Sequence, residues 1–170
     1  MSTPHRGYPS IQGLTWHRTR YYSFFTPMNW HRFEWPDGRE GEVYGPDPDD
    51  PHTIAGVSLD HLDTTLTADD LETVAEGFFG ALEQLPAISF ELRDQNVKGR
   101  VLMLEARFTY ADQDTVRKRW VRVIYHHTRQ VTFIAQGATP ERFAYWLPMF
   151  FQLMATANVH NEMPGIDFWG

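Results

Sequence analysis

The clearest hydrophobic pattern in the chain lies between residues 100 and 136. Residues 100–110 alternate, and one predicted face carries Leu102, Leu104, Ala106, Phe108 and Tyr110. Residues 117–127 alternate again, with Trp120, Arg122 and Ile124 on one side and Val121, Val123 and Tyr125 on the other. A polar turn at 128–130 and an apolar run at 131–136 follow. Such alternation is typical of half-buried strands, so three long strands are predicted here.

A helix is predicted to follow these strands. Thr139 is placed to cap it, and Pro140 suits the first helical position. Its apolar face carries, at helical spacing, Phe143, Leu147, Phe150, Met154 and Ala157. Pro148 lacks the N–H that an internal helical residue donates. We therefore expect a kink at Pro148 that divides the helix into two pieces.

The first half of the chain predicts shorter elements. Short strands are expected at 21–26, 30–35 and 39–44, with a turn at Pro36-Asp37-Gly38 and a loop at 45–51 before an extended segment at 52–62. A helix is expected from Thr67 to Leu85, with apolar residues Leu71, Val74, Phe78 and Leu82, and Pro86 ends it. A strand from Ile88 and a hairpin turn at Lys98-Gly99 lead into residue 100.

Consecutive strands joined by short turns pair as an antiparallel meander. The face with Leu102 and Tyr110 needs a helix against it, and we expect Val121, Val123 and Tyr125 to form the opposite face under the second helix. The prediction is an α+β domain, with an antiparallel β-sheet flanked by helices on both faces as an α/β/α sandwich.

Three parts of the chain are expected. Residues 1–15 form a flexible N-terminal arm, residues 16–158 form a single α+β domain, and residues 159–170 form a C-terminal tail. Within the tail, the apolar side chains of Ile166, Phe168 and Trp169 predict docking onto this domain or onto a second copy.

Composition narrows the function. The chain has 170 residues, a formal net charge of -7 and no cysteine, which excludes disulfides and zinc–thiolate sites. The acidic balance argues against nucleic-acid binding. The sequence lacks an apolar signal segment at its start and any run approaching ~20 apolar residues, so we expect a cytoplasmic location and no membrane insertion.

Candidate catalytic and metal-binding residues are few. His61 and Asp63 share a strand face without a third ligand at suitable spacing, so a polar strand edge is favoured over a metal site. His126 and His127 are adjacent in a predicted strand and are expected to point to opposite faces. The serines lie outside any nucleophile-elbow motif. The sequence therefore predicts neither a catalytic residue nor a metal or cofactor.

Candidate binding residues are cationic and aromatic. The basic run Arg117-Lys118-Arg119, together with Arg122, either forms a patch for an anion or an acidic protein, or forms a soluble sheet surface paired with Glu91 or Glu105. The dense aromatic set between residues 16 and 35 fits a core, a groove for a peptide or an apolar ligand, or a dimer contact. The candidate partner-binding residues are Arg107, Arg117, Arg119, Trp30 and Trp35.

The order of four motifs resembles the PsbP-like superfamily, which includes the extrinsic PsbP protein of photosystem II, the Ran-binding Mog protein and bacterial chaperones of type VI secretion effectors. The motifs are the strand and Pro-x-x-Trp turn from Phe24 to Trp30, the helix from Thr67 to Leu85, the glycine hairpin Val97-Lys98-Gly99-Arg100, and the strand-then-helix ending at 131–158. The resemblance implies an α/β/α sandwich that binds a partner without catalytic residues.

Two function classes remain open. The first, which the resemblance implies, is a non-catalytic protein-binding, adaptor or chaperone-like domain, with an acidic or amphipathic protein segment as its partner. The second is a small-molecule-binding protein or enzyme on a curved-sheet fold of the cyclase or isomerase type. A pocket that holds a buried His or Asp would favour the second class, and an exposed aromatic groove over a filled interior would favour the first.

Overall fold

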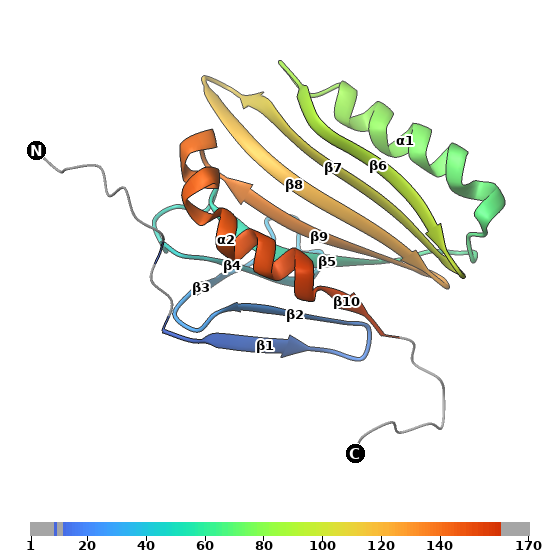
Figure 1. The fold of residues 1–170 in the computed structure, drawn as a ribbon, viewed down its shortest axis with the longest axis horizontal. Helices are drawn as coiled ribbons and strands as arrows, with labels where there is room; N and C mark the ends of the chain where they lie inside the picture. Colours follow the sequence, from blue (N-terminus) through green and yellow to red (C-terminus); the bar gives the residue numbers. More distant parts are fainter. Residues whose placement is uncertain (1–8, 10–11, 161–170) are drawn as a thin grey trace, which may run out of the picture.

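The computed structural model describes residue 9 and residues 12–160. Two antiparallel sheets carry two helices (Figure 1). The larger sheet has seven strands in the order β3-β4-β5-β9-β8-β7-β6, and the smaller has three in the order β1-β2-β10. The strands are β1 Leu14–Arg18, β2 Tyr22–Pro27, β3 His31–Phe33, β4 Glu40–Gly45, β5 Ile54–His61, β6 Ser89–Lys98, β7 Val101–Asp112, β8 Thr115–His126, β9 Arg129–Gly137 and β10 Asn158–Val159.

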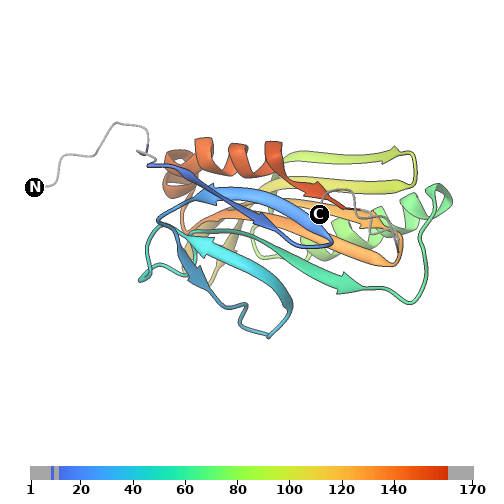
Figure 2. The ribbon, with the colours of Figure 1, turned by 90° about the horizontal axis from the view of Figure 1, so that it is seen from below.

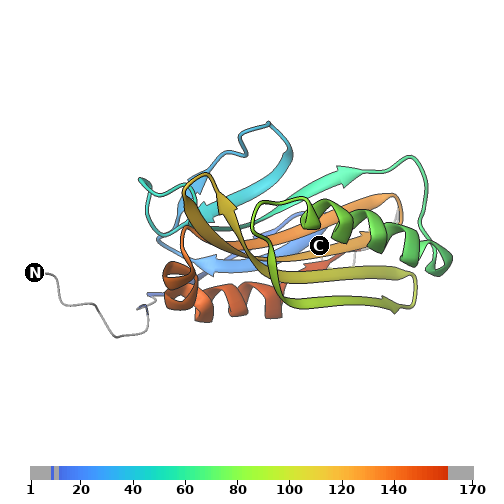
Figure 3. The same ribbon diagram turned by 90° about the horizontal axis from the view of Figure 1, so that it is seen from above.

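The two helices lie on opposite sides of the larger sheet (Figures 2 and 3). Helix α1 spans Leu71–Glu83 and helix α2 spans Pro140–Thr156. This arrangement confirms the predicted α+β fold with helices on both faces. Within the described residues, neither helix is long and apolar enough to cross a membrane.

Strands β6 to β9 form the predicted meander. The three turns between them have two residues each, and each begins with a residue at positive φ: Gly99 at 61°, Gln113 at 55° and His127 at 55°. Two-residue turns suit the twist of antiparallel strands and fix their register. The last turn is His127-Thr128, so it starts one residue before the polar turn that the sequence predicts.

The predicted assignment of faces is wrong for β8. Leu102 lies opposite Tyr125, and Leu104 lies opposite Val123, so these side chains share one face of the sheet. They form one apolar cluster with Phe79 of α1. Directly opposed residues in an antiparallel pair point to the same side. The α2 face instead carries the alternate set with Trp120, Ile124 and Phe133.

A capping interaction precedes each helix, and the one at Thr139 is the one that the sequence predicts. The carboxylate of Asp70 accepts a hydrogen bond of 2.7 Å from the backbone N–H of Thr67, ahead of α1, and a 3₁₀ turn at Ala68–Asp70 leads into the helix. The Thr139 hydroxyl accepts from the Arg142 N–H at 3.2 Å. Helix α2 runs continuously through Pro148, so the predicted division into two pieces is wrong.

Helix α2 packs between the two sheets. The side chain of Phe150 contacts Trp30 and Phe143, and Phe24 of β2 packs edge-on against Phe133 of β9. The smaller sheet includes two strands that the sequence does not predict as such. Strand β1 begins at Leu14, inside the predicted arm, and β10 pairs with β2. The tail residues Ile166, Phe168 and Trp169 lie outside the described residues.

Candidate functional site

The five predicted partner-binding residues lie in different places. Trp30 is buried and contacts Trp146 edge-on, with ring centroids 5.4 Å apart. Arg107 lies on the α2 face, 5.3 Å above the Trp120 ring. Arg117, Arg119 and Trp35 all belong to the opposite face. The structure therefore brings three of the five to one side of the sheet, and their role in partner binding stays a prediction.

The remaining cations of the basic run are engaged with acids. The Lys118 ammonium lies 2.7 Å from Glu91. The Arg122 guanidinium donates to Glu105 at 2.7 Å and to the Met154 carbonyl at 2.6 Å. These pairs involve the two glutamates that the sequence offers as cross-strand partners. On the α2 face, the positive charge of this run is largely compensated within the chain.

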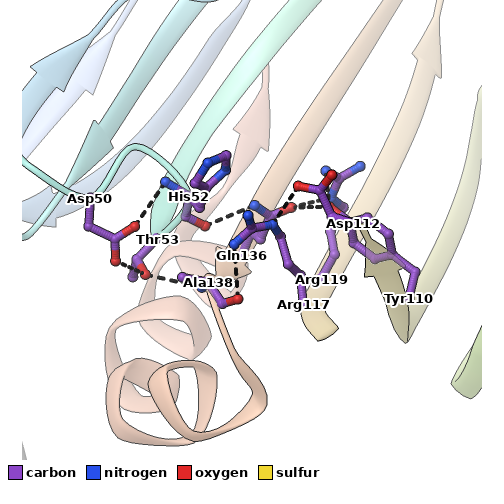
Figure 4. A network of polar contacts seen from close by, with 9 residues as sticks. All are labelled: Asp50, His52, Thr53, Tyr110, Asp112, Arg117, Arg119, Gln136 and Ala138. Atoms are coloured by element: carbon purple, nitrogen blue, oxygen red, sulfur yellow. Dashed lines mark hydrogen bonds and ion pairs between the residues drawn. The ribbon is translucent and has the colours of Figure 1, made fainter. Parts of the chain in front are cut away.

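Arg117 anchors a polar network at one end of the larger sheet (Figure 4). Its Nε donates to the Asp112 carboxylate at 2.7 Å, and its Nη1 donates to the Ala138 carbonyl at 3.1 Å. The hydrogen bond from Arg117 holds the pKa of Asp112 below its usual range. Arg117 and Asp112 therefore compensate each other's charge.

The same network fixes the loop before β5 against the end of β9. The Gln136 side-chain amide donates to the His52 carbonyl at 2.8 Å. The Thr53 hydroxyl donates to Asp50 at 2.6 Å and accepts from the Ala138 N–H at 3.1 Å. Figure 4 shows these contacts converging on Gln136 and Ala138. Side-chain hydrogen bonds therefore hold this loop where it joins strand β5.

Arg119 is the second arginine of this network, and its partners are neutral. Its Nε donates to the Gln136 side-chain oxygen at 2.8 Å, and its Nη2 donates to the Tyr110 hydroxyl at 2.9 Å. Tyr110 in turn donates to the same Gln136 oxygen at 2.9 Å. Among the described residues, no carboxylate forms an ion pair with Arg119. Burial lowers its pKa and the nearby Arg39 adds to the effect, whereas Tyr110 and the more distant Asp112 carboxylate oppose it.

A pocket of about 280 Å³ lies between Arg119 and the turn after β3. Its walls are Trp35, Ile54 and Ile134, and its rim is Pro36, Asp37 and Arg39. The Trp35 indole N–H donates to the Val57 carbonyl at 3.0 Å, which fixes the ring against the sheet. We call this cavity the arginine pocket. It brings together Trp35 and Arg119, two of the predicted partner-binding residues.

The two charged residues of the rim, Arg39 and Asp37, form an ion pair with each other. The Arg39 Nε donates to both oxygens of Asp37 at 2.9 Å, and the guanidinium lies 5.4 Å from the Trp35 ring. The hydrogen bonds from Arg39 lower the pKa of Asp37 to about 2, so Asp37 is ionised at neutral pH. The rim is thus close to neutral, and Arg119 supplies the net charge of the pocket.

A second opening follows strand β6, at the edge of the larger sheet. Within the described part of the chain, β6 pairs with β7 alone, so its outer edge is open along ten residues. A groove of about 490 Å³ lies between β6 and α1. The Gln95 N–H donates to the neighbouring Asp94 carboxylate at 2.9 Å. We call this opening the edge groove.

The edge groove is acidic. Glu72, Glu76 and Glu83 of α1 line it, and Gly80 leaves space between them. The cation on the β6 side, Arg93, lies 3.2 Å from Glu83 and covers the Phe79 and Phe90 rings at 4.6 and 4.7 Å. Two carboxylates of the groove are therefore left without a basic partner among the residues lining it.

The histidines are placed differently from the prediction. The rings of His126 and His127 lie 4.3 Å apart, because His127 leaves the strand at positive φ and no longer alternates with its neighbour. His61 lies 3.0 Å from Glu40 rather than in a site with Asp63. No three His, Cys, Asp or Glu side chains of the described residues come together as metal ligands.

The partners of Arg119 and the edge groove were not predicted from the sequence. The register of the meander places Arg119 opposite Gln136 and Arg117 opposite Tyr110. A two-residue turn fixes this register, so correct placement of the turns would have revealed the contacts. The edge groove depends on the distance of α1 from β6, for which the sequence carries no local signal.

Comparison with known proteins identifies the fold. No protein-family model matches the chain, and no curated protein matches it. Cyanobacterial PsbP (CyanoP) from Synechocystis sp. PCC 6803 is similar in structure, with a TM-score of 0.60 and 16% identity over 94% of this chain and 98% of that one. PA94 of Pseudomonas aeruginosa, a protein of unknown function, has a TM-score of 0.56 and 15% identity over 88% of this chain and 99% of that one.

LpqN of Mycobacterium tuberculosis, which is involved in cell envelope biogenesis, has a TM-score of 0.58 and 13% identity over 82% of this chain and 83% of that one. At such identities the likeness concerns the fold alone. The chain has the PsbP-like fold, as the order of its sequence motifs predicts.

Proposed function

We propose that this PsbP-like domain binds a protein partner without catalysing a reaction, and that the partner adds an extended segment to the edge of β6. The open edge beside the groove is the observation that carries this proposal. An unpaired strand edge presents backbone donors and acceptors that another extended chain can satisfy.

The backbone of β6 is suited to such pairing. The Gln95 N–H is now satisfied by the carboxylate of Asp94, its own neighbour in the strand. An incoming strand would replace this local contact with a carbonyl oxygen. Strand addition of this kind takes its affinity from main-chain hydrogen bonds and its specificity from the side chains that flank the edge.

The charges of the edge groove indicate the kind of partner. Glu72 and Glu76 line the groove, and the one arginine in its wall, Arg93, is paired with Glu83. A basic extended segment is therefore complementary to it. This sign is opposite to that of the acidic partner expected from the basic run, because the structure engages Lys118 and Arg122 with glutamates of the same chain. Charges of this kind accelerate association and exclude wrong partners.

The experiment uses a soluble decapeptide of alternating lysine and valine, with a glutamate–valine peptide of the same length as its control. NMR titration of the full chain should show the largest shifts at Gln95 and its neighbours in β6, and slower hydrogen exchange there. Binding should weaken as salt rises, because exposed charges are screened. Equal binding of the acidic peptide would contradict the proposal.

A matched pair of helix variants tests the groove. A Cβ at Gly77 or at Gly80 meets no atom within 4 Å, but Gly80 lines the groove and Gly77 does not. Gly80→Leu should weaken binding of the basic peptide by on the order of tenfold, through loss of space beside the added strand. Gly77→Leu should leave binding unchanged. Gln95→Pro removes the outward N–H and should also weaken binding.

If Gly80→Leu and Gln95→Pro both bind like the unchanged protein, the peptide does not use this edge.

The oligomeric state and the location of the protein need separate measurements. The oligomeric state follows from sedimentation, since a second copy paired edge to edge would double the mass. The cytoplasmic location expected from the sequence stays a prediction, which fractionation of the source cells would test.

A further inference from the structure

The charges around Arg119 do not balance. Arg117 is paired with Asp112, whose charge also acts on Arg119 without forming an ion pair with it, and Arg39 is paired with Asp37, so two carboxylates face three arginines. Arg119 donates only to the neutral oxygens of Tyr110 and Gln136. A largely covered cation such as Arg119 usually has an anionic partner, because removal of a charge from water without one is unfavourable. Arg119 lines an open cavity instead, so the place of its counter-ion is accessible from outside.

The arginine pocket has the form of a small-ligand site. Trp35, Ile54 and Ile134 give it apolar walls, and Arg119 gives it one fixed charge. Ligand sites are typically apolar cavities with a few polar groups that set orientation. A volume of about 280 Å³ is at the lower end for such sites, and suits a single ring or a branched side chain rather than a nucleotide.

Arg119 is held in position before any ligand binds. Its Nε and Nη2 are fixed by Gln136 and Tyr110, and the Tyr110 ring lies 5.1 Å from the guanidinium (Figure 4). Among the described residues its Nη1 has no acceptor. A guanidinium fixed in this way loses little conformational entropy when it binds a carboxylate.

We propose that the arginine pocket binds a small monocarboxylate with an apolar body. Its carboxylate takes the place of the missing counter-ion at Arg119, and its apolar part lies between Trp35 and the two isoleucines. A monoanion is preferred over a phosphate dianion, because Asp37 already compensates the charge of Arg39 and one uncompensated cation remains. This site is separate from the edge groove on β6 and adds a small-molecule ligand to the proposed protein partner.

The experiment uses benzoate, with benzamide as the uncharged probe of the same shape. Benzoate should shift the NMR signal of the Trp35 indole N–H and raise the melting temperature of the full chain, and benzamide should do neither. Arg119→Gln should weaken benzoate binding by on the order of tenfold, because it removes a charge-assisted hydrogen bond. Lys118→Gln removes the same charge from the next residue on the opposite face, and should leave binding within about twofold of the unchanged protein.

The same carboxylate chemistry is present at the C-terminus of a peptide. N-acetylphenylalanine and its amide are therefore measured beside benzoate. Tighter binding of benzoate assigns a free small acid, and tighter binding of N-acetylphenylalanine assigns a chain terminus. Equal binding of benzoate and benzamide would overturn the proposal.

Arg119→Gln also removes two internal hydrogen bonds, so its fold is checked by the NMR spectrum. A second variant changes a different wall of the pocket. Ile54→Phe keeps Arg119 and its partners, and should block benzoate by filling the cavity. If Ile54→Phe binds benzoate as well as the unchanged protein does, the ligand does not occupy this pocket and the proposal fails.

Discussion

The two faces of the larger sheet are covered to different degrees. Helix α2 buries five side chains: Phe143, Met149, Phe150, Leu153 and Met154. Helix α1 buries two, Ala75 and Phe79. The difference follows from position, because α2 packs against both sheets and α1 lies beside the edge strand β6 (Figures 1 and 3).

The two faces therefore have different roles: the α2 face contributes stability, and the α1 face is accessible to ligands. The α2 face is an aromatic core that includes Phe24, Phe133 and Phe150, none of which is exposed to solvent. The α1 face is left open at two places, the edge groove and the arginine pocket. We therefore expect substitutions on the α2 face to change folding, and substitutions at the two openings to change binding.

The largest expected difference is between one phenylalanine of each helix. Phe150 is 0% exposed between the sheets, and Phe79 is 7% exposed beside the edge groove. Phe150→Ala should cost ~3–5 kcal/mol in the free energy of unfolding, and Phe79→Ala about 2 kcal/mol, because Phe79 lines the edge groove and its truncation leaves no closed cavity. Urea unfolding measures both. Equal losses would show that the two faces contribute alike.

A second contrast concerns the ion pairs of the two faces. Arg122 satisfies Glu105, whose side chain is 11% exposed, and also the Met154 carbonyl at the end of α2. Arg122→Gln should therefore cost about 2–3 kcal/mol. Arg93→Gln, which breaks the exposed pair with Glu83, should cost no more than ~1 kcal/mol. A large loss for Arg93→Gln would place α1 among the elements that determine stability.

A third prediction concerns pH and the smaller sheet. Burial lowers the pKa of His17 and of His160 from their ordinary value of 6.5. The unfolded chain then binds more protons than the folded chain, so stability is full above about pH 6.5 and falls as the pH drops toward the folded pKa values. His17→Gln should reduce this dependence. Urea unfolding between pH 7.5 and pH 5 measures it, and a rise in stability on acidification would contradict the sign.

The smallest expected effect is a gain. Gly77 and Gly80 lie inside α1, where a side chain meets no neighbour. Replacement of either by Leu should raise the free energy of unfolding by ~0.5–1 kcal/mol, because glycine is a poor helix former. Thermal unfolding compares the two variants. A loss for Gly80→Leu alone would show that the edge groove closes in solution.

The elements of this fold could be predicted from local pattern, and their faces could not. Alternation located β7 and β8, and Thr139 located the start of α2. The faces of β8 require the pairing of Leu104 with Val123, which depends on the turn between the strands. A shift of one residue exchanges the two faces of a strand. The predicted turn was also displaced by one residue. His127 was therefore assigned to the strand, and the two histidines were expected to point to opposite faces.

The candidate site was predicted in part. Arg119 and Trp35 were chosen for charge and aromatic character, and the structure places both at one pocket. Their proximity depends on the turn at residues 36–38 folding over the sheet, which is a tertiary contact. Pro148 is the converse case, in which a local signal for a helix break is overridden by packing on both sides of α2. Propensity is a weak guide where tertiary contacts are extensive.

Strand β2 pairs with β1 on one side and with β10 on the other, so the first and last strands of the described chain share one neighbour. About 130 residues separate β2 from β10. During synthesis, at about 5–20 residues per second, the hairpin β1–β2 is made roughly ten seconds before the helix and strand that cover it. Its aromatic side chains are exposed for that interval, which makes the nascent N-terminal hairpin a segment that chaperones would be expected to protect.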